Sequence, residues 1–129
     1  MTVDNSASSP LEPNALGALI EMVGLDEPDF LIELIDTFLV DSSDIVSGMP
    51  ESWRNNDRET VLRAAHSLKS TSATFQALRL SKLSSDLESE MRGDETGMDV
   101  TSQIDQIVAE HLLVKEALAH ERAKLEATL

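Results

Sequence analysis

The sequence contains no cysteine and is poor in basic residues. Without cysteine, the chain forms no disulfide and offers no thiolate ligand to a metal. Its 10 lysines and arginines stand against 24 aspartates and glutamates, giving a net charge of -14. Because nucleic-acid binding depends on clustered cations that neutralise phosphates, we expect no nucleic-acid partner.

Long apolar runs are also missing, and none approaches the roughly 18 residues that a membrane-spanning helix needs. The first ten residues, MTVDNSASSP, lack the basic and apolar regions of a secretory signal. We therefore expect a cytoplasmic protein with no membrane partner. A length of 129 residues fits one domain, and we expect a disordered polar tail over residues 1–10 followed by a helical domain over residues 11–129.

Apolar residues recur at helical spacing from Leu11 almost to the end of the chain. This spacing predicts helices over about 13–23, 28–53, 57–75, 80–91 and 100–125, with the segment GDETG at 93–97 as the one obvious linker. Asp57 is expected to cap the third helix. Gly48 and Pro50 are expected to bend or break the second helix near its end.

Aromatic residues make up only 3% of the chain and no segment alternates apolar and polar residues, so strands are not expected. Short connections between amphipathic helices favour antiparallel neighbours. The sequence therefore predicts an all-α fold, an antiparallel up-and-down four-helix bundle with a short N-terminal covering helix. We expect a monomer, since no dimer interface is indicated.

Three histidines occupy different helical positions. His66 lies roughly 140° from the centre of its helix's apolar stripe, so it is expected to face solvent. His111 falls inside the stripe of the last helix and is interpreted as a packed or partly buried structural histidine. His120 points away from that stripe, which predicts a solvated side chain.

The surroundings of His66 set it apart from an ordinary surface histidine. Lys69, three positions on, is within reach of a group attached to the ring. Nearby residues are small or partly apolar and suit close approach by another protein; the candidate docking residues are Leu62, Arg63, Ser70, Ala73 and Ala77. Residues 58–85 also contain five basic residues and one acidic residue, which favours an anion or an acidic partner pocket. Of the five basic residues, Arg58 and Lys82 are interpreted as ordinary solvated side chains.

An exposed imidazole is a nucleophile that can accept a phosphoryl group and pass it on. No acid or base partner for His66 is visible in the sequence, and phosphoryl transfer depends mainly on positioning and charge neutralisation. A carrier function is therefore the leading interpretation. The alternative is a helical adaptor that binds signalling partners without chemistry. An enzyme is disfavoured because no Gly-rich nucleotide loop is present, and a metal-binding bundle because inward Glu and His ligands are missing.

The segment HSLKSTSATF, residues 66–75, resembles the HxLKG(S/A)(S/A) signature of histidine-containing phosphotransfer (HPt) domains. The resemblance covers roughly residues 11–92 and includes, at the family's usual spacing, Ala77, Leu80, Leu87 and Glu88. Ser70 and Gln76 stand where the family usually has glycine, and Pro50 is unusual within the second helix. The family typically folds as a helical bundle.

The resemblance implies a phosphorelay intermediate of two-component signalling, not an enzyme. It implies that His66 is the phosphoacceptor and that Lys69 supports the phosphate. The implied partners are response-regulator receiver domains and a hybrid sensor histidine kinase. No cofactor is expected on this chain, because the Mg²⁺ needed for transfer is expected on the receiver domain.

Overall fold

The computed structural model describes residues 10–13, 15–23, 28–93, 97 and 99–127. These residues form five helices and no strand. The helices are α1 (Ala15–Val23), α2 (Pro28–Arg54), α3 (Arg58–Thr74), α4 (Leu78–Met91) and α5 (Val100–Glu126). The disordered tail expected over residues 1–10 falls almost entirely outside the described residues, as do residues 94–96 of the expected linker.

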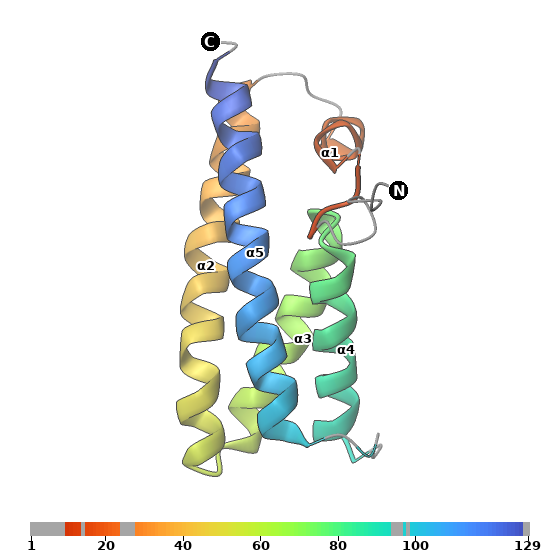
Figure 1. The fold of residues 1–129 in the computed structure, drawn as a ribbon, viewed down its shortest axis with the longest axis vertical. Coiled ribbons are helices and arrows are strands. Elements are labelled where there is room, and N and C mark those ends of the chain that lie inside the picture. The colour runs from red at the N-terminus through yellow and green to blue at the C-terminus, as the bar shows by residue number, and fades with distance from the viewer. Residues whose placement is uncertain (1–9, 14, 24–27, 94–96, 98, 128–129) are drawn as a thin grey trace, which may run out of the picture.

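Helices α2 to α5 run alternately down and up and form the expected antiparallel bundle (Figure 1). Each helix packs against two others: α2 lies beside α3 and α5, and α4 lies beside the same two helices. At about 1.5 Å per residue, the 27 residues of α2 and of α5 span about 40 Å, well beyond the 17 residues of α3 and the 14 of α4. The bundle therefore contains four helices only along the part where both α3 and α4 are present.

The core is built from one face of each long helix. Fully buried apolar side chains, all under 2% exposed, come from α2 (Leu31, Ile35, Met49), α3 (Val61, Leu68), α4 (Leu80, Leu87) and α5 (Ile107, Val114). Burying a side chain of this size stabilises the fold by about 1.5–3 kcal/mol. Because these residues fix the inward face of α3 and α4, they also fix which residues of those helices face solvent.

The sequence predicts that Gly48 and Pro50 bend or break the second helix. A break is wrong, because α2 continues as one helix through both residues to Arg54. Proline removes one backbone hydrogen bond from a helix interior. Here Met49 is buried and Trp53 packs against the core, so the residues on both sides of Pro50 are held in the helix by tertiary contacts.

The N-terminal segment meets the end of the bundle where α3 turns into α4 (Figure 1). Leu11 and Ala15 are buried in the common core, and the Glu12 amide donates a hydrogen bond to the Gln76 carbonyl, N···O 3.0 Å. This is the covering element that the sequence predicts. Among the described residues, no helix is both long and apolar enough to cross a bilayer.

Candidate functional site

Helix α3 holds His66 on its solvent-facing side. The helix begins after Asp57, whose carboxylate accepts a hydrogen bond from the Thr60 amide at 3.2 Å, as expected for a cap. Val61, Ala65 and Leu68 point into the core. The His66 side chain is 59% exposed, so the prediction that it faces outward is confirmed.

The inner edge of the imidazole contacts a buried carboxylate from the neighbouring helix. His66 Nδ1 lies 2.7 Å from Glu88 Oε2 on α4. A carboxylate only accepts hydrogen bonds, so Nδ1 is the nitrogen that carries the proton when the ring is neutral. The lone pair is then on Nε2, away from Glu88. The contact therefore selects the tautomer in which the outer ring nitrogen is the nucleophile.

Glu88 also binds two cations. Lys69 Nζ lies 2.7 Å from Oε1, and Arg92 donates to Oε2 from Nε at 3.2 Å and from Nη2 at 2.8 Å. The hydrogen bond from Lys69, followed by that from Arg92, lowers the Glu88 pKa to about 2 against the opposing effect of burial. Glu88 is therefore a charged acceptor at neutral pH although its side chain is only 6% exposed.

Close packing of α3 against α4 brings Glu88 to His66. Glu88 belongs to the buried face of α4 together with Leu80, Leu87 and Met91. The Ser81 hydroxyl of α4 donates to the Lys69 carbonyl of α3 at 2.8 Å and links the two helices beside the site. The carboxylate is thus held by the same packing that forms the core.

The sequence interpretation missed the role of Glu88. It found no acid or base partner for His66, because the two residues are 22 positions apart and lie on different helices. A signal was present: Glu88 stands on an apolar helical stripe, and a carboxylate there needs a partner. Glu110 on α5 carries the same signal, being buried and bound by Arg79 at 3.1 Å.

Four of the five predicted docking residues are at least partly accessible. Arg63 and Ser70 are exposed, and Leu62 and Ala73 are intermediate. Ala77 is the exception, since it is completely buried at the start of α4. The prediction for Ala77 is wrong because α3 ends at Thr74 and the chain turns inward there, so the helical spacing that placed Ala77 in line with Ala73 no longer applies.

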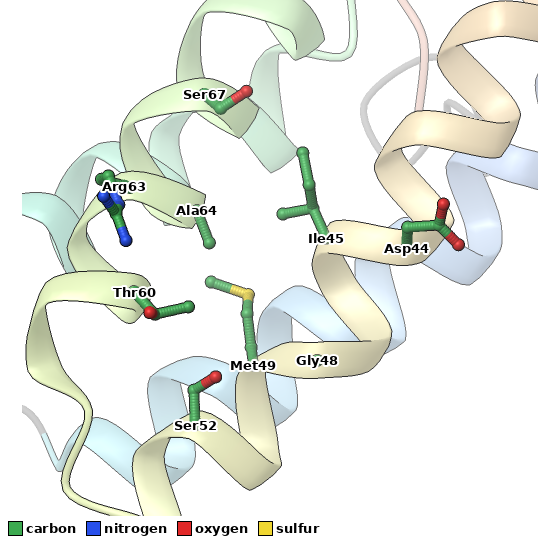
Figure 2. A pocket seen from close by; sticks show the side chains of 9 residues that line it. All are labelled: Asp44, Ile45, Gly48, Met49, Ser52, Thr60, Arg63, Ala64 and Ser67. Atoms are coloured by element: carbon green, nitrogen blue, oxygen red, sulfur yellow. The ribbon is translucent and has the colours of Figure 1, made fainter.

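A groove of about 280 Å³ runs between α2 and α3, beside the helix that carries His66. Figure 2 shows Thr60, Arg63, Ala64 and Ser67 of α3 on one side and residues of α2 such as Ile45 and Met49 on the other. Ser67 directly follows His66, and Arg63 is one of the predicted docking residues. The α3 surface near His66 therefore continues into a partly apolar hollow on the side of α2.

The other two histidines do not join this site. His111 is 4% exposed and forms a hydrogen bond with Ser42 of α2, Nε2···Oγ 2.8 Å. Desolvation, and then the charge of Lys115, lowers the His111 pKa to about 4. His120 is exposed on α5. Both positions confirm the predictions from helical spacing.

Comparisons with known proteins show the family and the fold of the chain. Residues 33–124 match the family model of the Hpt domain. The fold is similar to the crystal structure of histidine-containing phosphotransfer protein B (HptB) from Pseudomonas aeruginosa PAO1, with a TM-score of 0.76 and 25% sequence identity over 88% of this chain and 95% of that one. A search of curated protein sequences gave no match. The chain belongs to the Hpt domain family, the domains that carry out histidine phosphotransfer in the phosphorelays of two-component signalling.

Proposed function

We propose that His66 accepts a phosphoryl group on Nε2 from an aspartyl phosphate of one receiver domain and delivers it to another. The observation that carries the proposal is the contact between His66 Nδ1 and Glu88 Oε2, because in the neutral ring it places the proton on Nδ1 and the lone pair on Nε2, on a side chain that is 59% exposed. On this proposal the protein is a phosphoryl carrier, not an enzyme.

Phosphoryl transfer to His66 needs no proton donor on this chain, because the leaving group departs as an anion. The Nε2 lone pair forms the N–P bond as the P–O bond of the aspartyl phosphate breaks, and the aspartate leaves as a carboxylate. The attack leaves positive charge on the ring, which still carries its Nδ1 proton. The charged, buried Glu88 next to that proton offsets the developing charge.

The receiver domain completes the reaction site. The receiver would supply the Mg²⁺ ion and the acceptor carboxylate, while Lys69 would offset charge on the phosphoryl oxygens. Arg63, Ser70 and Ala73, with the groove between α2 and α3, give the receiver an accessible surface around the nucleophile. A hybrid sensor histidine kinase would carry the first of these receivers. We propose that the protein acts as a monomer in the cytoplasm.

Transfer of radiolabelled phosphate from a phosphorylated receiver domain, with Mg²⁺, tests the assignment. The wild-type protein should acquire label that is labile in acid and stable in base, and His66→Gln should acquire none. His120→Gln is the matched control, because it removes another exposed imidazole from the same molecule. Label on His66→Gln would disprove the assignment. Unlabelled wild type that still binds the receiver would support the adaptor function instead.

A further inference from the structure

Glu88 has two carboxylate oxygens and three donor side chains, and the donors are divided unequally between them. Oε1 is bound by Lys69. Oε2 is bound by His66 Nδ1 and by both Nε and Nη2 of Arg92. Lys69 can therefore leave the carboxylate without disturbing the oxygen that orients the imidazole.

Phosphorylation of His66 would draw the Lys69 ammonium away from Glu88. A phosphoryl group on Nε2 brings up to about two negative charges to the surface of α3. Lys69 is three residues from His66 on the same helix, but its ammonium is held at 2.7 Å by Glu88. Supporting the phosphoryl group thus requires Lys69 to exchange one anion for another.

Without a second cation, this exchange would be unfavourable. Glu88 is only 6% exposed, and a buried carboxylate that loses its cationic partner is strongly destabilised. Arg92 changes the balance because its guanidinium remains on Oε2 when Lys69 leaves. The Arg92 side chain is 53% exposed. Arg92 follows Met91, the last residue of α4, and is four positions after Glu88.

We propose that Arg92 is a positioning residue that holds the charge of Glu88 while Lys69 moves to the phosphoryl group on His66. The proposal rests on the phosphotransfer function proposed for His66. Arg92 stabilises the phosphorylated state, so that the equilibrium between phosphohistidine and receiver aspartyl phosphate shifts toward the phosphohistidine. Arg92 has this effect through Lys69.

The test measures that equilibrium for purified full-length protein and one phosphorylated receiver, in wild type, Arg92→Gln, Lys69→Gln and the double variant. Arg92→Gln should shift the equilibrium toward the receiver by roughly fivefold, the size expected for a partly exposed charge pair. In the Lys69→Gln background the same substitution should change it by less than about twofold, because the residue through which Arg92 acts is gone. Arg92→Lys keeps the charge. The logarithm of its equilibrium constant should lie at least halfway from that of Arg92→Gln back to that of the wild type.

Lys82→Gln is the matched control, since it removes a cation of α4 that pairs with Asp86 at the surface, and it should leave the equilibrium unchanged. An equal effect of Arg92→Gln with and without Lys69 would overturn the proposal, as would no effect at all or no rescue by Arg92→Lys. These failures are distinct from failure of the proposed function, which would appear as missing label on wild type or as label on His66→Gln.

Discussion

Glu88 Oε2 lies 2.7 Å from His66 Nδ1, and this contact fixes the chemistry of the exposed ring from inside the bundle. Glu88→Gln should reduce the initial rate of phosphoryl acceptance by roughly tenfold or more, because an amide can present either a donor or an acceptor to Nδ1 and no longer selects one tautomer. Rapid-quench labelling with a phosphorylated receiver measures the rate.

Glu110→Gln is the matched control for that substitution. Glu110 is also a buried carboxylate with an arginine partner, but it binds Arg79 and lies on α5. Its variant should accept phosphate at nearly the wild-type rate. If both variants are slowed equally, the loss comes from the bundle as a whole and not from the contact with His66.

The buried His111 should make the fold sensitive to mild acid. Its pKa is about 4 in the folded protein, against 6.5 for the unperturbed side chain, so the unfolded chain binds more protons between these values. The free energy of unfolding should therefore fall as the pH drops from about 6.5 to 4, by roughly 3 kcal/mol at most from this residue. Urea denaturation at a series of pH values measures the slope. His111→Gln should flatten it, and an unchanged slope would contradict the assignment.

Glu88 should add a second acid-sensitive step at lower pH. Its folded pKa of about 2 lies below the ordinary value of 4.5, so its contribution to stability is present above about 4.5 and is lost as the pH falls toward 2. Glu88→Gln should reduce the loss of stability in this lower window and leave the His111 step in place. Thermal melts at pH 7, 5, 4 and 3 separate the two steps, and the same pH dependence in both proteins would argue against a charged Glu88.

Gly48 is an exposed residue inside α2, and a Cβ at this position would meet no atom within 4 Å beyond its chain neighbours and the backbone of its own helix. Gly48→Ala should stabilise the protein by about 0.5–1 kcal/mol, because alanine loses less backbone entropy in a helix. Gly93→Ala is the contrasting variant: Gly93 has φ +97°, so it should destabilise. Denaturation midpoints of the two variants should move in opposite directions.

Gln76 occupies a left-handed conformation, φ 61°, in the turn between α3 and α4. This explains why a glycine at this position suits the turn, since glycine adopts such angles without a Cβ clash. Gln76→Gly should therefore be tolerated and stabilise by up to about 1 kcal/mol. Asn56, with φ 63°, gives the comparison: Asn56→Gly should gain less, because asparagine tolerates the left-handed region better. Equal gains, or a loss at Gln76, would show that the glutamine side chain contributes to the turn.

Local patterns in the sequence were sufficient for the helices and for the outward face of α3. The stripe of Val61, Ala65 and Leu68 placed His66 in solvent, and the stripe of α5 placed His111 inside, because helical geometry repeats regularly along the chain. The same regularity failed at Ala77, where a turn separates the residue from α3. At Pro50 the local expectation of a break was wrong, because tertiary contacts keep α2 intact.

The sequence by itself determined that an accessible imidazole and a lysine share one helix, since both properties depend on residues at most a few positions apart. Only the tertiary structure decided the partner of each side chain. Glu88 reaches His66 and Lys69 because α4 packs antiparallel against α3, and the distance between two helices is set by the core that they bury together. Arg92 is the local partner, one turn further along the chain from Glu88. That packing determines which ring nitrogen is left to react.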